Sequence, residues 1–469
     1  MMMRALILLC LAVTLSSCAV KEAPDAAEVR AQALPQSTAI PPAYREAADT
    51  ATGAVTEGWL ASFHDSRLNA LVREAIAHNL NLHAAVANVD AAAGLATQAG
   101  AELKPVVAAG GKANRFDAGG LKQLTQTGAA VNMSWELDLW GRVRAQSKAG
   151  QAAFEAAQYQ LAWIYQSVAA QTVKSWFLLS EARQQLKLAE DALKLYQQTL
   201  KLVQSQYRQG RVTEGDVALA RANVARGEAQ VRQARGARQQ AARALELLLG
   251  RYPAGAMAGA ERFEMELPPV PAGLPSELLE RRPDLKAAEH AIAAQFFKVE
   301  SAKAARLPRV ALTAGGGTSS NQLANLLNLG SNFWSVGSNF MLPLYTGGAL
   351  KAQVDIESAQ FQAALANYGQ KALKAFAEVE QGLANERLLR ERENYLRAAV
   401  RESATALRVA QKQFEVGKVS LLSVLQQQGL LISAKVALTN IQDQRLQQRV
   451  DLYLALGGGF DAPAGESKQ

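Results

Sequence analysis

The chain has 469 residues, of which 49% are hydrophobic, and its 50 basic and 42 acidic residues give a net charge of +8. Lysine and arginine alternate with glutamate and form no basic cluster with stacking aromatic residues, so the positive charge does not indicate a nucleic-acid partner. Cys10 and Cys18 are the only cysteines. If Cys10 leaves with an N-terminal signal, the mature chain has no intramolecular disulfide.

The first residues have the pattern of a secretory signal. Arg4 precedes an apolar run from Ala5 to Leu15, which is too short for a membrane-spanning helix of about 20 residues. A polar segment rich in Ala, Pro, Asp and Glu follows. We therefore predict that residues 1–17 are a signal peptide and that the chain is exported.

The end of this segment, Leu15-Ser16-Ser17-Cys18, resembles a bacterial lipobox, in which the peptide is cut before the cysteine and the cysteine is acylated. Ala19 stands where inner-membrane retention would require aspartate, so the resemblance implies the outer membrane. An ordinary signal peptide with a chance cysteine is the alternative. On the lipobox interpretation Cys18 is the lipidation site of an N-terminal lipid-anchored segment, residues 18–58, although one lipid alone anchors weakly.

An internal repeat organises the rest of the chain. Residues 137–141 match 342–347, and residues 207–212 match 414–419, in the same order along both halves. We predict a first repeat over residues 59–250, a Pro- and Gly-rich linker or equatorial segment over 251–283, a second repeat over 284–457 and a polar C-terminal tail over 458–469. Each repeat has the pattern of a helix, two strands, one very long helix, a glycine turn and a further helix.

The first very long helix is predicted over residues 142–208 and would be about 100 Å long at 1.5 Å per residue. Apolar and small residues step by four and three from Leu161 to Tyr207, which indicates a coiled-coil seam. The second repeat has a similar seam, interrupted by Glu386 and Glu393. A second helix with the same spacing follows each glycine turn, so each repeat predicts an antiparallel helical hairpin.

Two stretches, from Val131 to Trp140 and from Trp334 to Leu344, alternate between apolar and polar residues, as a strand with one apolar face does. Each has about the 9 to 11 residues of a membrane-spanning strand. Gly- and Ala-rich partner strands are predicted over residues 106–116 and 309–318. We predict that the apolar face contacts lipid through Val131, Met133, Trp135, Leu137, Leu139, Trp334, Val336, Phe340 and Leu342.

Four strands cannot close a barrel, and open strand edges are not tolerated in lipid. Several chains must therefore contribute to one barrel, and three chains would give twelve strands. The alternative is a small soluble sheet whose apolar face lies under a helix of a bundle.

Three motifs resemble those of TolC-like outer-membrane efflux factors. They are Trp59-Leu60-Ala61-Ser62-Phe63-His64-Asp65, then Arg281-Arg282-Pro283-Asp284-Leu285, and Leu342-Pro343-Leu344-Tyr345 before Gly347-Gly348. The resemblance implies an α+β membrane protein that forms a homotrimer, with a 12-stranded β-barrel on a long periplasmic α-helical barrel. With the lipobox, it implies the lipoprotein branch of the family. The implied partners are a periplasmic membrane-fusion adaptor, an inner-membrane pump of the resistance-nodulation-division (RND) type and outer-membrane lipid.

The resemblance also implies functional sites at the two glycine turns, which form the periplasmic tips in this family. Candidate adaptor contacts are Gly210, Arg211, Val212, Thr213, Asp216, Gly417, Lys418, Val419 and Ser420. In the lipoprotein branch the second tip presents a leucine and, four residues later, an aspartate, which together constrict the closed duct. The matching residues are Leu422 and Gln426, which share a helix face. Gln426 departs from the family pattern, and the alternative is that Leu422 packs between helices and Gln426 is merely solvated.

We expect the outer-membrane exit duct of a tripartite efflux system, exporting drugs or other toxic small molecules. The alternatives are a duct for type I protein or peptide secretion, and a structural coiled-coil lipoprotein that spans the periplasm and would have no use for amphipathic strands. No enzyme, cofactor or metal site is expected, because the four histidines lie beside neither cysteines nor a paired acidic cluster. They are His64, His78, His83 and His290.

Overall fold

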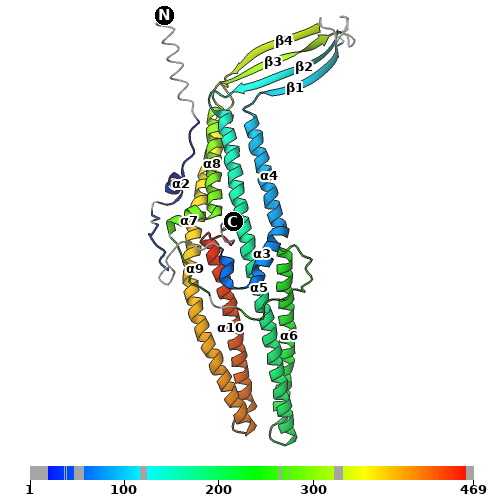
Figure 1. The fold of residues 1–469 in the computed structure, drawn as a ribbon, viewed down its shortest axis with the longest axis vertical. Coiled ribbons are helices and arrows are strands. Elements are labelled where there is room, and N and C mark those ends of the chain that lie inside the picture. The colour runs from blue at the N-terminus through cyan, green and yellow to red at the C-terminus, as the bar shows by residue number, and fades with distance from the viewer. Residues whose placement is uncertain are drawn as a thin grey trace, which may run out of the picture. The chain divides into compact units, whose positions relative to one another are not determined.

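The computed structural model describes residues 20–35, 37–38, 40–46, 58–116, 124–263, 267–273, 275–321 and 331–460. The predicted signal peptide and Cys18 lie outside these residues. Figure 1 shows the elements, which in chain order are α2 (Ala26–Ala33), η2 (Trp59–Phe63), α3 (Ser66–His78), α4 (Leu80–Ala101), β1 (Val106–Phe116), β2 (Leu124–Leu137), α5 (Arg142–Arg208), α6 (Glu214–Leu248), α7 (Pro275–Arg281), α8 (Pro283–Ala304), β3 (Arg309–Ser320), β4 (Asn332–Met341), α9 (Ala349–Glu415) and α10 (Leu421–Ala455).

The two halves of the chain have the same order of elements, which confirms the predicted duplication of a helix-strand-strand-long helix-helix unit. In each half a helix, α4 or α8, leads into two strands. The strands are followed by a helix of 67 residues, α5 or α9, and then by one of 35 residues, α6 or α10. The helix predicted over residues 142–208 has the predicted bounds.

Helices α5 and α9 are continuous over their whole length because neither contains proline, which would remove a backbone hydrogen bond and kink the helix. Much of the predicted seam along α5 is buried, including Val168, Leu179 and Val203. A polar seam residue, Thr172, is also buried, and its hydroxyl donates to the carbonyl oxygen of Val168 at 2.7 Å. This local hydrogen bond lets threonine occupy a core position.

All four strands form one antiparallel sheet in the order β1-β2-β3-β4. The pairing of β2 with β3 joins the two repeats. Gly317 is required at this central pair, because a Cβ atom there would lie 2.1 Å from the carbonyl oxygen of Ala129. In the described part of the chain β1 and β4 pair on one side only, so a single chain has an open edge at each end of its sheet.

The strand bounds differ from the prediction for local reasons. β2 begins earlier, and it ends at Leu137 rather than at residue 140. The cause is Asp138, whose carboxylate accepts hydrogen bonds from the backbone N–H groups of Val143 at 3.0 Å and Arg144 at 2.8 Å. This contact satisfies N–H groups at the start of α5 and turns the chain out of the sheet. β4 likewise ends two residues before Pro343, which has no N–H to donate.

Two compact units divide the chain, and each takes segments from both repeats. One unit comprises Met1–Thr38, Val86–Gln160 and Asp284–Lys371 and contains the sheet. The other comprises Ala39–Ala85, Leu161–Pro283 and Ala372–Gln469 and contains the turns of both helical hairpins. The repeats are therefore units of sequence and topology, whereas packing unites segments of the two halves.

The beginning of the C-terminal segment is packed rather than being part of a polar tail. Phe460 is buried, and its ring centroid lies 5.1 Å from that of Tyr165. The N–H group of Gly58 donates to the carbonyl oxygen of Gly459 at 2.8 Å. The prediction of a polar tail therefore does not hold for residues 458–460, because the ring of Phe460 is buried against Tyr165.

Among the described residues, α10 is the one helix with the length and composition of a membrane span. Its buried side chains argue for a protein environment instead, because Asp443, Arg445 and Arg449 are charged types and lie inside the fold. Charged groups at the centre of a bilayer are costly. We therefore assign α10 to the helical part of the protein.

Candidate functional site

The strand register gathers the predicted apolar residues on one face of the sheet. Directly opposed residues of antiparallel strands project to the same side. Val131 lies opposite Gly316, which lies opposite Trp334, and the rows through Met133 and Leu137 reach Val336 and Phe340 in the same way. Trp135 has the same alternation as its β2 neighbours, so seven of the nine predicted residues share this face. We call it the apolar sheet face.

The remaining two predicted residues, Leu139 and Leu342, lie just beyond the ends of β2 and β4. The apolar sheet face is open to its surroundings in the single chain, since Trp334, Val336 and Phe340 are 82%, 75% and 65% exposed. None of the described helices covers these β4 side chains. The alternative of a small soluble sheet that hides its apolar face under a helix therefore does not describe β4.

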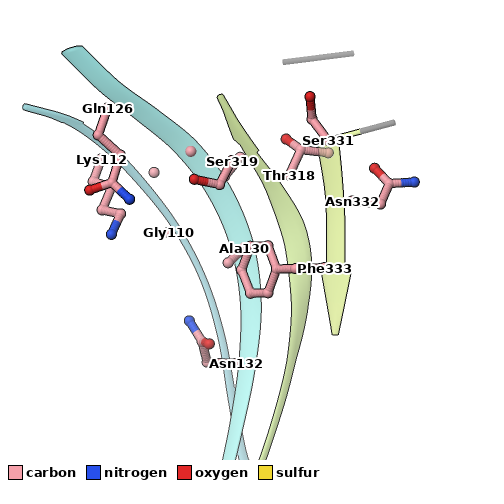
Figure 2. Close-up of a pocket in the computed structure, with 13 residues that line it drawn as sticks. Gly110, Lys112, Gln126, Ala130, Asn132, Thr318, Ser319, Ser331, Asn332 and Phe333 are labelled. Carbon is pink, nitrogen blue, oxygen red and sulfur yellow. The ribbon is translucent and has the colours of Figure 1, made fainter. Parts of the chain in front are cut away.

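The opposite face of the sheet is polar and rich in glycine. A hollow of about 700 Å³ on it is lined by Gly110, Lys112, Gln126, Asn132 and Ser319, among others. Figure 2 shows Lys112 and Gln126 on the side of β1 and β2, and Ser319 and Phe333 on the side of β3 and β4. One sheet thus has an apolar and a polar face, the division expected of a strand between lipid and a water-filled lumen.

Ionic contacts join the ends of the strands to the helices that follow. Glu136 of β2 accepts two hydrogen bonds from Arg142, from Nε and Nη2, both at 3.0 Å. The hydrogen bond with Glu136 is the main reason that the pKa of Arg142 is raised. Asp138 also pairs with Arg144 at 3.0 Å. The polar residues that alternate with the apolar ones near the end of β2 therefore hold α5 in place.

The two hairpin turns close with the same backbone geometry. Gly210 and Gly417 have φ values of 73° and 76°, and the residue after each donates its N–H to a carbonyl five residues earlier, Arg211 to Gln206 at 3.0 Å and Lys418 to Gln413 at 2.8 Å. This arrangement is a Schellman motif, in which glycine tolerates the left-handed conformation. The duplicated turns are structurally equivalent.

Several of the predicted tip contacts have structural roles in these turns. Thr213 caps α6 in a capping box with Asp216, whose N–H donates to the Thr213 hydroxyl at 3.3 Å. Ser420 caps α10 by accepting from the N–H of Ser423 at 3.4 Å. Val212 and Val419 pack against a buried cluster that joins the two hairpins.

Arg211 and Lys418 are the predicted tip residues with exposed charged side chains. Val416 is also exposed, immediately before Gly417, and the sequence analysis did not single it out. In the sequence, Val416 could have been noticed as an apolar residue at the end of a helix, where polar residues are expected. We call these three exposed residues the tip residues: Arg211, Val416 and Lys418.

The start of α10 separates buried from exposed leucines. Leu421 and Val424 are buried in the cluster that joins the hairpins, whereas Leu422 is 56% exposed and Gln426 is also exposed. Leu430 continues the same face and is 57% exposed. Within one chain Leu422 therefore does not pack between helices, and it shares an open face with Gln426, as residues four apart on a helix do.

A buried ionic network connects α9 with α10. The Glu393 carboxylate accepts hydrogen bonds from Arg445, from Gln442 at 3.1 Å and from Arg397 at 3.0 Å. Burial raises the pKa of Glu393, but these hydrogen bonds, that from Arg445 first, outweigh burial and hold the pKa below its ordinary value. Glu386 pairs in the same way with Arg449 on α10. The two glutamates that interrupt the predicted α9 seam thus have cationic partners.

Asp443 on α10 is also a buried carboxyl group, and one of its oxygens has no hydrogen-bond partner among the described residues. Burial, and next the charge of Glu181, raise the pKa of Asp443 to about 7. The folded state therefore favours the protonated form, and the contribution of Asp443 to stability falls as pH rises from 3.8 to about 7. Asp443 stands apart from the exposed face of Leu422 and Gln426.

The histidines take part in ordinary local contacts. His290 lies with Nδ1 2.9 Å from Glu155, and its ring stacks on Tyr159 with centroids 5.0 Å apart. A ring nitrogen of His83 is 3.1 Å from the carbonyl oxygen of Ala77. Within the described residues no three His, Cys, Asp or Glu side chains are grouped to hold a metal ion.

Comparison with known proteins identifies relatives over nearly the whole chain. The family model described as outer membrane efflux protein matches residues 71–251 and 274–458. The probable efflux pump outer membrane protein TtgC of Pseudomonas putida is 31% identical over 437 residues, which cover 91% of this chain and 90% of TtgC. The cation efflux system protein CusC of Escherichia coli is 28% identical over 457 residues, covering 96% of this chain and 98% of CusC.

Solved structures of similar proteins superpose on nearly the whole chain. A CusC structure superposes with a TM-score of 0.81 at 27% identity and covers 93% of this chain and 99% of its own. The outer-membrane channel OprN superposes with a TM-score of 0.83 at 26% identity and covers 94% of this chain and 99% of its own.

Proposed function

Because this chain belongs to the outer membrane efflux protein family, we propose that three copies assemble into one exit duct that crosses the outer membrane and extends into the periplasm. The chain is an outer-membrane channel of a tripartite efflux pump, and it is a transport protein rather than an enzyme. The main support for assembly is the sheet of the single chain. It has one apolar face, one polar face and two open edges.

The open edges explain why more than one copy is needed. Unpaired strand edges are too costly in lipid, so the edge strands β1 and β4 must pair with β4 and β1 of neighbouring copies. Three copies of a four-stranded sheet close a barrel of twelve strands. In that barrel the apolar sheet face contacts lipid and the face with Lys112 and Asn132 lines the lumen.

We also propose that acylated Cys18 anchors the chain to the outer membrane. The lipobox motif supports this proposal. Lipid anchors hold a protein less firmly than membrane-spanning segments do, so the barrel supplies most of the attachment and the lipid adds to it.

The hairpin turns are the proposed contacts for a periplasmic membrane-fusion adaptor, which in turn joins an inner-membrane RND-type pump. Exposed charge at Arg211 and Lys418, together with exposed apolar Val416, supports this role. The cargo we propose is small toxic molecules, because the names of the relatives refer to efflux of antibiotics, toluene and cations. Secretion of a protein or peptide is the less favoured alternative.

The test of this function uses a deletion strain of the native host, which should accumulate more of a fluorescent pump substrate and recover with the wild-type gene. The double variant Arg211→Glu/Lys418→Glu should form trimers and yet fail to restore efflux. If Arg211 and Lys418 contact acidic side chains of the adaptor, charge reversal replaces attraction with like-charge repulsion, which costs several kcal/mol at an interface. Crosslinking to the adaptor should then fall by at least about tenfold. The substitutions leave the capping residues Gly210, Thr213, Gly417 and Ser420 intact.

The matched control is Arg232→Glu/Lys371→Glu, which makes the same charge change at exposed helical positions away from the turns. It should restore efflux. Full recovery with both double variants would contradict the adaptor role, and a monomeric wild-type protein in a native mass spectrum would contradict the duct itself.

The exposed face of Leu422 and Gln426 is the proposed gate at the periplasmic end. Leu422→Ala should raise single-channel conductance in planar bilayers, because three copies of a smaller side chain widen the constriction. Gln426→Asp should introduce block by divalent cations, since three carboxylates would face one another in the lumen. Leu430→Ala, two turns further from the tip, is the control and should change conductance less. Unaltered conductance and block in the first two variants would show that these side chains do not face the lumen.

A further inference from the structure

A basic hollow lies where β2 turns into α5. It has a volume of about 590 Å³ and is lined by Val20, Lys21, Trp140, Lys303, Arg306 and Leu307, with other residues. The hollow combines three segments that are distant in sequence: the N-terminal segment, the β2–α5 turn and the end of α8. All of them belong to the compact unit that contains the sheet. We call this feature the junction hollow.

The N-terminal segment is packed tightly against the β2–α5 turn. Gly141 has a φ value of 77°, and a Cβ atom added to it would lie 2.6 Å from Cγ2 of Val20. The turn therefore needs glycine both for its backbone conformation and for the close approach of Val20. In the sequence, Val20 lies two residues after Cys18, the proposed acylation site.

Three cations line the junction hollow and are opposed by one carboxylate. Lys303 pairs with Glu300 at 2.7 Å. Lys21 and Arg306 make no ion pair with a described acidic side chain, so the hollow has a net positive charge. Lys303 and Arg306 lie at the C-terminal end of α8, where a helix dipole favours cations, but this explanation does not extend to Lys21, which comes from the N-terminal segment.

Exposed apolar surface borders these cations. Trp140 and Leu307 are 41% and 42% exposed, and the indole Nε1 of Trp140 donates to the carbonyl oxygen of Pro308 at 2.6 Å, which fixes the ring. An indole beside basic residues is the combination found at membrane interfaces, where the ring lies at head-group depth and the cations attract anionic lipids. Trp140 lies three residues after Leu137, with which β2 ends.

We propose that the junction hollow binds the head-group phosphate of an anionic glycerophospholipid from the periplasmic leaflet, one per protomer. Lys21 and Arg306 hold the phosphate, and the acyl chains extend over Trp140 and Leu307 toward the apolar sheet face. The site rests on the proposed function, because only a chain that crosses the outer membrane through its sheet has this junction at the leaflet surface. It would hold the N-terminal segment against the turn from which α5 begins.

The test is native mass spectrometry of delipidated trimers in a non-ionic detergent, with phosphatidylglycerol, phosphatidylcholine or inorganic phosphate added. Wild-type trimers should retain up to three phosphatidylglycerol molecules and bind phosphatidylcholine and inorganic phosphate much more weakly. Lys21→Gln/Arg306→Gln should weaken phosphatidylglycerol binding by about thirtyfold, which is about 2 kcal/mol at roughly 1 kcal/mol per cation and 1.4 kcal/mol per factor of ten. Lys201→Gln/Arg408→Gln removes two exposed cations from the helical hairpins and should leave binding unchanged.

A second measurement locates the lipid. Phosphatidylglycerol with brominated acyl chains should quench tryptophan fluorescence of the wild type, and Trp140→Phe should remove a distinct part of that quenching. Equal binding of phosphatidylglycerol and phosphatidylcholine would overturn the recognition of anionic lipid, and tight binding of inorganic phosphate would replace the lipid with a free anion. Equal losses in the two double variants would also overturn it.

The trimer mass and channel conductance of the same preparations separate this proposal from the proposed function. Conducting trimers that bind no phosphatidylglycerol reject the site alone. Monomers without conductance would contradict the proposed duct. The lipid site would then also lose its place at the periplasmic leaflet.

Discussion

Met133→Arg should sharply reduce the amount of assembled trimer in the outer membrane. Met133 lies in the middle row of the apolar sheet face, opposite Ala314, which lies opposite Val336. A cationic side chain on the lipid face of a barrel costs about 2 to 4 kcal/mol near the bilayer midplane. The three copies in a trimer would each bear this cost. Folding into lipid vesicles, followed by urea titration, measures the loss.

The control for this prediction is the next residue. Ser134 lies on the polar face, in the row with Thr313 and Gly337, so Ser134→Arg should place its charge in the aqueous lumen with little effect on assembly. Ser134 is a better control than Glu136, another polar residue of β2, because Glu136 accepts two hydrogen bonds from Arg142 and its replacement would also disturb that contact. Equal losses from Met133→Arg and Ser134→Arg would contradict the proposed orientation of the sheet.

Glu393→Ala should lower the stability of the helical hairpins by about 3 to 5 kcal/mol, the usual effect of removing one partner from a buried ion pair. Glu393 is 2% exposed, and the change would leave buried Arg445 without this carboxylate. Chemical denaturation followed by circular dichroism provides the measurement. Glu393→Ala/Arg445→Met should recover much of the stability, because a buried pair replaced by apolar side chains is often neutral.

The effect of pH on stability provides the control for Glu393→Ala. The lowered pKa of Glu393 means that its stabilising contribution is present above the ordinary value of 4.5 and is lost as pH falls through the folded-state pKa. The stability difference between wild type and Glu393→Ala should therefore shrink below pH 4.5. A difference that stays constant down to acid denaturation would contradict a charged Glu393 in the folded state.

Periodicity predicted the long helices, the bounds of α5 and the shared face of seven strand residues, because each of these features repeats locally along the chain, whereas the membrane fold class was implied by the motif resemblance. The partners of Glu386 and Glu393 could not be predicted in this way. Each glutamate interrupts a heptad pattern on α9, and the arginines that explain it lie 63 and 52 residues further along the chain on α10. Pairing between helices leaves no periodic signal in one sequence.

The strand ends were predicted less well for a similar reason. Leu139 continues the apolar alternation of β2, but Asp138 accepts hydrogen bonds from the first turn of α5 and ends the strand before it. A cap and an alternating strand residue look alike in sequence when the residue is aspartate. At the tips, motif resemblance indicated Arg211 and Lys418, whereas the exposure of Val416 became apparent only from the structure.

The pairing of β2 with β3 has a consequence for how the protein folds. Thr127 donates its hydroxyl to the carbonyl oxygen of Ser320, 193 residues away, and loops of this length make strand pairing slow relative to local helix formation. The long helices, whose hydrogen bonds are local, should therefore form before the sheet is complete. An exported chain that followed this order would carry soluble helical hairpins through the periplasm and expose its apolar strands last, when the bilayer is at hand to cover them.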